Sequence, residues 1–544
     1  MYVLLGALFV YVLLQTGTRG TAVGLVAGSL AMVVYIALFA TRYKQIQKYA
    51  MGALIALLVL IAGFVSIRDT DFIQHNAALS RVANINLGND LMVRGMIWGM
   101  AVEGIKERPV LGWGQGNFNY VFNKYYDPKL YGQEQWFDRT HDIFFDWLIA
   151  GGVFGLVAYL SIFAAIFYYL IVRPLRVQDD SFTVVERGVL VGLMVGYLLH
   201  NVVVFDNIVS YIFFGTILAL MHSRVGSPIP KLMTLRIPVP VITQVVTPVV
   251  LVGMSACVYM VNVPGLLAAQ DIIVAFSAQD LSQRLEDFNT ALSRDSFARQ
   301  EIVEQLAQQA MNIASAQDQV PEAVRKAYVT RAESELLAMA AEKPGDARLE
   351  VFLASYYRSI GDAAKAAEHM ALARTLSPRK QAIILQQGAI ALSLGKNDEA
   401  LGFFKEAYEL ATDNDEAREY YVGALFLAKD AAAARTLIDE STDAFKKRIA
   451  LSDFVVSAVN TAQEYTTLAD LYEVRVAADT TSAQNWASLA FVYYQLKQND
   501  KAIETLARAG KAVPAFATTA ECITKNLQAG REPQIGCQPQ QAPQ

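Results

Sequence analysis

Long apolar runs alternate with charged segments over the first half of the chain. Each run approaches the ~17–25 residues that cross a ~30 Å hydrocarbon core as a helix. The runs lie at about residues 1–16, 21–40, 50–66, 148–172, 188–205, 207–222 and 238–262. The pattern predicts an all-α fold whose first part, residues 1–262, is a polytopic transmembrane domain of about seven spans.

The basic residues of the short connections predict how these spans are oriented. Lys and Arg collect on the cytoplasmic side of membrane proteins. They occur in three alternate connections, at Arg42, Lys44, Lys48, Arg173, Arg176, Arg187, Arg224, Lys231 and Arg236. We therefore expect the long connection 67–147, and everything after about residue 263, to lie on the outer side of the membrane.

From residue 347 the apolar and small residues recur every 34 positions, which is the period of tetratricopeptide repeats. The clearest unit begins at Ala483 and has the expected residue types at Trp486, Leu489, Ala490, Tyr493, Ala502, Leu506, Ala509 and Pro514. Further units begin at 449, 415, 381 and 347. The unit at 449 is degenerate, because Val456 and Leu468 stand where small residues belong. The pattern predicts an α-solenoid over residues 347–516, with a concave groove for a protein partner.

The segments beside the repeats have weaker patterns. Residues 263–346 read as polar entry helices that cap the array. Residues 517–544 are expected to be a partly disordered C-terminal tail, because the last fourteen are rich in Gln and Pro and cannot bury a core. Cys522 and Cys537 form a disulfide if the tail faces an oxidising space, and two reduced thiols are an equal alternative.

Composition narrows the classes of function. Hydrophobic residues make up 54% of the 544 residues and charged residues 18%, below the roughly one quarter that soluble proteins carry. The net charge of −5 gives no broad positive footprint, so nucleic-acid binding is not expected. The three cysteines lack the spacing of a zinc site.

The connection 67–147 carries most of the candidate chemistry, since loops of this length usually have a function. It contains a glycine-rich sequence at 108–118, followed by an aromatic cluster. The glycines lack the Lys-Ser/Thr of a P-loop and the βαβ context of a dinucleotide site, so a tight turn is the plain interpretation. Most of the aromatic residues fit an interfacial belt, and Trp113 and Trp136 are the better candidates for stacking on a sugar.

Three basic groups stand out by position: Arg19 in a turn between two apolar runs, Arg94, and His141 just before the fourth run. A guanidinium near lipid is costly unless it is paired, so such residues are functional candidates. Taken singly, each has a plainer alternative. Arg19 could snorkel to the interface, Arg94 could lie on a solvated helix face, and His141 could be an interfacial histidine.

Together these groups belong to an ordered set of motifs. Along the chain the set comprises Thr16-Gly17-Thr18-Arg19-Gly20, Arg94 with Trp98 and Ala101, Pro109-Val110-Leu111-Gly112-Trp113-Gly114-Gln115-Gly116-Asn117-Phe118, and His141 followed by Gly152, Val153 and Gly155. The combination, over about residues 1–222, resembles the O-antigen ligase-related superfamily, which includes Wzy-type polymerases and protein O-oligosaccharyltransferases. Similar members also carry C-terminal tetratricopeptide repeats.

The resemblance implies a glycan transferase of the bacterial inner membrane that needs no metal or cofactor. Its donor would be a glycan on a polyprenyl-diphosphate carrier, and its acceptor a hydroxyl of a lipid or protein on the outer face. Arg19 and Arg94 would bind the diphosphate, because a guanidinium presents a planar fork of donors to such oxygens. His141 would accept the proton of the acceptor hydroxyl or bind the diphosphate.

Weaker substrate-binding candidates are Trp113, Gly114, Trp136, Asp142 and Asp146. The family commonly has Asn after the histidine and an acidic residue before the Gly-Gly pair, where this chain has Asp142 and Ala150. Asp146 lies one helical turn beyond Asp142. It is expected either to orient His141 or to line a water-filled mouth together with Asp142.

Family members usually have more spans than the seven expected here, so the bundle is expected to be an N-terminally incomplete form of a GT-C-like architecture. The chain would then be a fragment, begin at a mis-set start codon, or be a decayed enzyme. The motifs do not separate ligase, polymerase and protein glycosyltransferase. An alternative from another class is a non-catalytic, membrane-anchored scaffold of envelope polysaccharide assembly, whose repeats recruit a peptide.

Overall fold

The computed structural model describes residues 2–16, 18–84, 87–227, 238–316 and 319–537. Every regular element within these ranges is a helix, which confirms the all-α prediction. The chain divides into two units. The first consists of Met1–Asp127 and Gln135–Arg299, and the second of Pro128–Glu134 and Gln300–Gln544.

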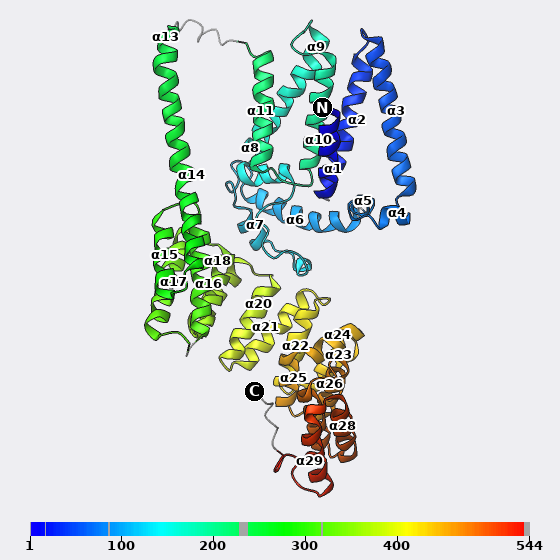
Figure 1. Cartoon of the computed structure of the whole chain (residues 1–544), viewed down its shortest axis with the longest axis vertical. Helices are drawn as coiled ribbons and strands as arrows, with labels where there is room; N and C mark the ends of the chain where they lie inside the picture. Colours follow the sequence, from blue (N-terminus) through cyan, green and yellow to red (C-terminus); the bar gives the residue numbers. More distant parts are fainter. Residues whose placement is uncertain (1, 17, 85–86, 228–237, 317–318, 538–544) are drawn as a thin grey trace. The chain divides into compact units, whose positions relative to one another are not determined.

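The first unit is built mainly from long helices and has a group of short ones in the connection 67–147 (Figure 1). Its elements are α1 (Tyr2–Thr16), α2 (Arg19–Phe39), α3 (Lys44–Ile67), α4 (Asp71–Gln74), α5 (Ala77–Ala83), α6 (Leu87–Glu107), α7 (Phe118–Lys124), α8 (Ile143–Phe167), η2 (Tyr168–Val172), α9 (Arg173–Arg176), α10 (Val184–Asn201), α11 (Ile208–Val225), α13 (Val239–Val241), η3 (Ile242–Val246), α14 (Thr247–Ser277) and α15 (Leu281–Ser293).

Five helical stretches in the described residues are long and apolar enough to cross a membrane. They are Arg19–Phe39, Lys44–Ile67, Ile143–Arg176, Ile208–Val225 and Val239–Ser277. Helix α1 has only 15 residues, and α10 is not in this set. The predicted count of seven spans is therefore not confirmed. The last stretch also runs on to Ser277, because α14 has no break near residue 262.

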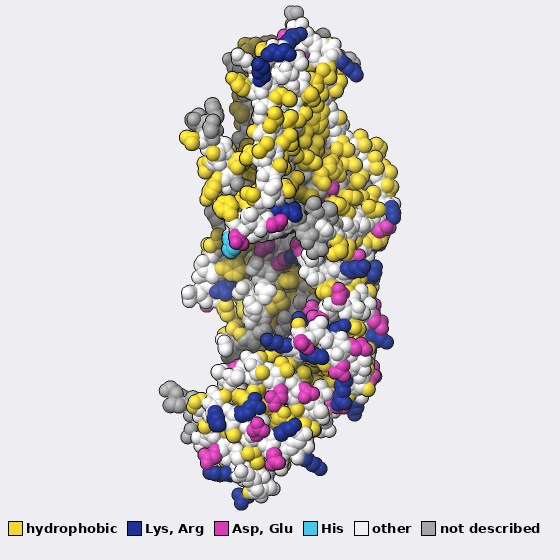
Figure 2. Space-filling model, turned by 90° about the vertical axis from the view of Figure 1, so that its right-hand side faces the viewer, with side chains coloured by type: hydrophobic (Ala, Val, Ile, Leu, Met, Phe, Trp, Pro, Cys, Tyr) yellow, Lys and Arg dark blue, Asp and Glu magenta, His cyan; other side chains and the backbone are white. Residues whose placement is uncertain are grey.

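The surface of the first unit agrees with burial in lipid. On the face that Figure 2 shows, hydrophobic side chains cover much of this unit, whereas side chains of both charges are spread over the second unit. Leu60 and Val252 are each 69% exposed to the surroundings of the chain. Large apolar side chains exposed in such number along whole helices are expected where hydrocarbon is the solvent.

Glycines bring α2 and α10 into backbone contact. Gly20, Gly24 and Gly28 recur every fourth residue on α2, as Gly188, Gly192 and Gly196 do on α10. A Cβ atom added to Gly24 would lie 2.7 Å from the carbonyl oxygen of Gly196, and one on Gly28 would lie 2.6 Å from that of Gly192. Small residues allow this close packing of membrane helices, so α10 is held to α2 by backbone contacts.

The second unit is a series of antiparallel helix pairs (Figure 1). Its elements are η1 (Pro128–Leu130), α16 (Arg299–Ser315), α17 (Glu322–Glu342), α18 (Ala347–Ser359), α19 (Ala363–Leu376), α20 (Gln381–Ser393), α21 (Asn397–Leu410), α22 (Asp415–Leu427), α23 (Ala431–Asp439), α24 (Asp443–Leu451), α25 (Asp453–Thr461), α26 (Tyr465–Ala478), α27 (Ala483–Gln495), α28 (Asn499–Ala512), η4 (Pro514–Phe516) and α29 (Ala517–Gln528).

The helix starts follow the 34-residue spacing of the sequence. The first helices of four pairs begin at Ala347, Gln381, Asp415 and Ala483, where the pattern places the repeat starts. Small residues let the two helices of a pair cross closely. In the second pair, a Cβ on Gly388 would lie 2.4 Å from the Phe404 ring. The second unit therefore carries tetratricopeptide repeats.

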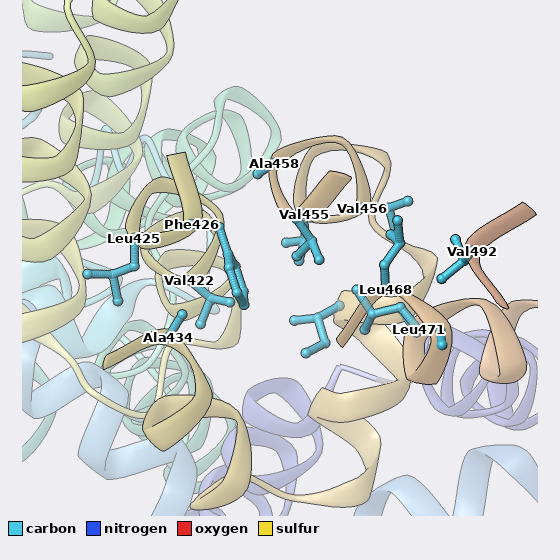
Figure 3. Packing of buried hydrophobic residues seen from close by; sticks show 14 of the residues in the cluster. Val422, Leu425, Phe426, Ala434, Val455, Val456, Ala458, Leu468, Leu471 and Val492 are labelled. Carbon is cyan, nitrogen blue, oxygen red and sulfur yellow. The ribbon is translucent and has the colours of Figure 1, made fainter. Parts of the chain in front are cut away.

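The fourth repeat departs from this spacing. Its first helix, α25, begins at Asp453 and not at 449, and the short helix α24 precedes it. Val456 and Leu468 are buried there in a cluster that also contains Phe445 from α24. Figure 3 shows this cluster running from Phe426 on α22 to Leu468 on α26. The larger side chains need more room between the helices, and α24 supplies an additional apolar wall.

The region after the last repeat contains a further helix. Residues 517–528 form α29, whose Ala520 and Leu527 are buried in a cluster with Leu506 of α28. Residues 531–537 fold back on this helix, and Cys537 forms a disulfide with Cys522. Residues 538–544 lie outside the described residues. The helix covers the end of the array, because a terminal repeat needs a polar cap over its apolar face.

Candidate active site

A break in α8 organises the loop that follows α6. Gly152 lies within α8 but has φ 61° and ψ −157°, a left-handed region that favours glycine. A Cβ atom there would lie 2.3 Å from the carbonyl carbon of Val110. The amide of Val153 donates to the carbonyl of Pro109 at 2.9 Å instead of to its own helix. The loop backbone at Pro109 and Val110 thus packs directly against the α8 backbone at the break.

The glycine-rich loop supplies the hydrogen bonds that the break removes. The amide of Trp113 donates to the carbonyl of Ile149 at 2.6 Å. The amide of Gly114 donates to the carbonyl of Ala150 at 3.1 Å. Buried backbone groups have to be paired, so the motif at 109–116 and the Gly-Gly pair of α8 form one structural element. The sequence-based interpretation as a tight turn did not foresee this partner.

Trp113 fastens the same loop to α6. Its indole Nε1 donates to the carbonyl of Gly104 at 2.8 Å, and the Arg108 guanidinium lies 4.2 Å from the centre of its ring. These contacts use the only hydrogen-bond donor of the indole and cover one face with a cation. Trp136, the other candidate for sugar stacking, is half-buried in the segment leading to His141.

His141 is held in an unusual backbone conformation, with φ 55°. The preceding Thr140 is fully buried, and its amide donates to Asp146 Oδ1 at 2.8 Å. The Thr140 hydroxyl lies 2.8 Å from the same oxygen, and Trp98 Nε1 donates to the Thr140 carbonyl at 3.2 Å. Asp146 Oδ1 therefore binds Thr140, the residue before His141. The sequence analysis expected Asp146 either to orient the His141 ring or to line a water-filled mouth.

Asp142 caps the start of α8. Its Oδ1 accepts from the amides of Phe144 at 2.8 Å and Phe145 at 3.1 Å. Burial raises the pKa of the Asp142 carboxyl, and these two amides oppose the shift. The cap fixes where the helix begins, and it places His141 directly before the first turn.

Arg94 joins two segments that are distant in the sequence. Its Nη1 donates to the carbonyl of His141 at 3.1 Å and to the carbonyl of Val203 at 2.6 Å. Trp98, one turn along α6, stacks on Phe145 with ring centroids 5.8 Å apart. Arg94 and Trp98 of α6 thus contact the segment around His141, and Arg94 also contacts Val203.

The Arg19 turn reaches the same segment. A Cβ atom on Gly20 would lie 2.7 Å from the Val203 side chain, and Thr21 Oγ1 lies 3.4 Å from His200 Nδ1. Arg19 itself is half-buried at the first turn of α2. Residues 200–205 thus contact Arg94, His141 and the turn next to Arg19, which come from three parts of the chain.

Aromatic rings flank the imidazole. His141 packs against Phe137 at 5.4 Å and Phe205 at 5.2 Å between ring centroids. The Arg139 guanidinium lies 5.9 Å from the centre of the Phe205 ring. The cation and the rings define one wall beside His141.

Asp206 is a residue that the sequence analysis did not select. It is 8% exposed, and its Oδ1 accepts from Tyr197 at 2.5 Å, Asn201 at 3.2 Å and Ser210 at 3.0 Å. Its Oδ2 is buried without a hydrogen-bond partner among the described residues. The signal that could have found it is an acid between two apolar runs, which is costly near lipid.

The arrangement can bind an anion and move a proton. Arg19 at the start of α2 and Arg94 on α6 offer charge-assisted donors, and the imidazole of His141 can accept a proton. Among the residues that the structure describes, no three His, Cys, Asp or Glu side chains are grouped to hold a metal ion.

Comparison with known families finds a match within the first unit. Residues 4–160 match the family model Wzy_C, described as O-Antigen ligase. The match spans Arg19, Arg94 and His141, and it confirms the resemblance that the motifs predicted. It covers a minor part of the chain. No curated protein matches the chain.

Solved structures give weak likenesses. A MamA fragment from Desulfovibrio magneticus RS-1 is 14% identical, and the match covers 30% of this chain and 94% of the fragment with a TM-score of 0.27. Pseudomonas aeruginosa PilF is 15% identical, with 43% and 100% covered and a TM-score of 0.29. The Cut9–Hcn1 complex is 13% identical, and the match covers 90% of this chain and 94% of that chain with a TM-score of 0.27.

Proposed function

Because residues 4–160 are similar to O-antigen ligases, we propose that this chain is a membrane glycan ligase. It transfers a glycan from a polyprenyl-diphosphate carrier to a hydroxyl of a lipid or protein acceptor. The observation that carries the proposal is the position of Arg94, which binds the backbone of both His141 and Val203. Gly20 packs on the same Val203, and this contact supports a role for the neighbouring Arg19.

The chemistry follows from these groups. The bond between the anomeric carbon and the phosphate oxygen of the carrier breaks, and a bond to the acceptor oxygen forms. Negative charge develops on the leaving diphosphate, where Arg19 and Arg94 stabilise it. His141 accepts the proton that the acceptor hydroxyl loses. The Asp142 cap of α8 and the hydrogen bonds between Thr140 and Asp146 fix the backbone on both sides of His141.

An apolar groove supports the choice of a lipid-linked donor. It lies along the α2–α10 contact and has a volume of about 380 Å³. Its lining includes Gly24, Gly28, Gly192, Gly196, Leu25, Met32 and Val189. Thr21 and His200 also line it, next to the Arg19 turn. The groove can take part of an isoprenoid chain while the diphosphate reaches the arginines.

The proposal includes a topology. The basic connections face the cytoplasm of a bacterial cell, and the site and the repeats face outward from the inner membrane. The organisation is a transmembrane domain at 1–262, entry helices at 263–346, repeats at 347–516 and a terminal region at 517–544. The repeats offer a groove to a protein partner.

The first prediction tests the catalytic residues. Arg94→Ala and His141→Ala should each lower glycan transfer by about 10²-fold or more, because each removes charge stabilisation or proton transfer. Transfer is measured in membranes that carry labelled lipid-linked glycan, at matched protein level. Arg81→Ala and His75→Ala are the controls, since both residues are exposed in the same connection. Full transfer by both site variants would contradict the assignment.

A scaffold without catalysis is the second candidate, because repeats occupy most of the second unit. A doubly substituted chain, Arg94→Ala with His141→Ala, separates the two functions. A scaffold would still restore envelope polysaccharide in a deletion strain, whereas a ligase would not.

A further inference from the structure

A short segment of the connection 67–147 folds with the repeats. Residues 128–134 group with the second unit, although residues 127 and 135 on either side belong to the first. The segment has the sequence Pro-Lys-Leu-Tyr-Gly-Gln-Glu and begins with the single turn η1. It lies between α7 and His141 along the chain.

Two hydrogen bonds connect this segment to successive repeats. Gln381, the first residue of α20, is 1% exposed, and its Nε2 donates to the Pro128 carbonyl at 3.1 Å. The hydroxyl of Tyr131 donates to the Asp413 carbonyl at 2.9 Å. Asp413 lies in the turn before α22, so both contacts are at the starts of the first helices of neighbouring repeats.

Two apolar residues of the segment are buried. Leu130 is fully buried, and Pro128 is buried as well. A three-residue turn has too few residues to cover its own leucine. Other parts of the chain therefore cover Leu130, and the segment itself groups with the repeat unit. In contrast, Leu111 of the same connection is 75% exposed.

We propose that the start of the second and third repeats is a docking site for residues 128–134 of the same chain. The site recognises an extended turn through one buried leucine, one backbone carbonyl and one tyrosine hydroxyl. Seven residues of the connection that leads to His141 are thereby part of the repeat array. The inference is independent of the proposed glycan transfer, since it concerns only the fold of the second unit.

Hydrogen–deuterium exchange of the full-length protein in nanodiscs tests the docking. Leu130→Asp should raise exchange of amides at 381–384 and 413–417, because a carboxylate cannot stay in the apolar site. Tyr131→Phe should raise exchange near 413 by a few-fold, up to about tenfold, since it removes one hydrogen bond. Leu111→Asp and Tyr120→Phe are the matched controls and should leave both segments unchanged.

A photo-cross-linker gives an independent measurement. Benzoyl-phenylalanine in place of Tyr131 should form its cross-links within residues 377–417. Exchange at 483–512 reports whether a variant has unfolded the array. If Leu130→Asp raises the exchange at 483–512, this variant has unfolded the array, and the docking is then judged from Tyr131→Phe and the cross-link. Unchanged exchange in both variants, or cross-links elsewhere in the chain, would overturn the proposal.

Discussion

Single residues of the candidate site act mainly by pairing with backbone atoms. Arg94 could be selected from the sequence for two reasons. A guanidinium near lipid is costly unless it is paired, and Arg94 belongs to the ordered set of motifs. Its bonds to the carbonyls of His141 and Val203 could not be predicted, since they join positions far apart in the chain. Asp206 escaped notice for the same reason, because its burial depends on the side chains of the helices on either side of it.

Lys380 provides a pH-dependent prediction for the repeat unit. Its side chain is fully buried, and burial lowers the pKa of Lys380 from 10.5 to about 7. Between these values the unfolded chain binds more protons than the folded one. The free energy of unfolding should therefore rise from about pH 7 to pH 10.5, by up to about 1.4 kcal/mol per pH unit.

Urea unfolding of the full-length protein in detergent, followed by helical circular dichroism, measures this slope. Lys380→Met should flatten it over the same pH window. Lys396→Met is the control, because the Lys396 side chain is 53% exposed and should leave the slope as it is. An unchanged slope in Lys380→Met would show that the lysine is not the titrating group.

At the scale of elements, α8 and the glycine-rich loop form one structural element joined by backbone hydrogen bonds. The motif residues were visible in the sequence, and their tight turn was expected. The sequence could not show that Trp113 and Gly114 pair with carbonyls of a broken helix, because only the fold brings the loop to Gly152.

Gly152→Ala should destabilise the first unit by about 3 kcal/mol or more, because the left-handed backbone and the contact with Val110 both exclude a Cβ atom. Thermal unfolding in detergent, followed by tryptophan fluorescence, measures the loss. Gly151→Ala is the matched control, since its Cβ atom would meet nothing within 4 Å. Equal melting temperatures of the two variants would refute the structural role of the kink.

At the scale of the whole molecule, an apolar helical unit is joined to a repeat unit that ends in a disulfide. The bridge between Cys522 and Cys537 closes a 15-residue separation and ties the last turn to α29. Disulfides persist in oxidising compartments. The pairing supports the proposed outward location of the repeats, for which the sequence left both redox states open.

Thiol labelling tests this location. In denatured extracts of whole cells, a maleimide should react with one cysteine, Cys257, before reduction and with all three after it. The shift in mass on a gel counts the labelled thiols. Cys522→Ser provides the reference, because Cys537 should then react without reduction. Three reactive thiols in the unreduced parent would place the terminal region in a reducing compartment.

The sequence by itself determined the helical class, the apolar stretches and the repeat starts at 347, 381, 415 and 483, because these depend on periodicity within short stretches. It also selected Arg19, Arg94 and His141. Only the tertiary structure decided that Arg94 binds the carbonyls of His141 and Val203, that Gly152 opens α8 for the loop, and that residues 128–134 fold with the repeats. Each of these depends on contacts between residues distant in the chain, and no local pattern encodes such contacts.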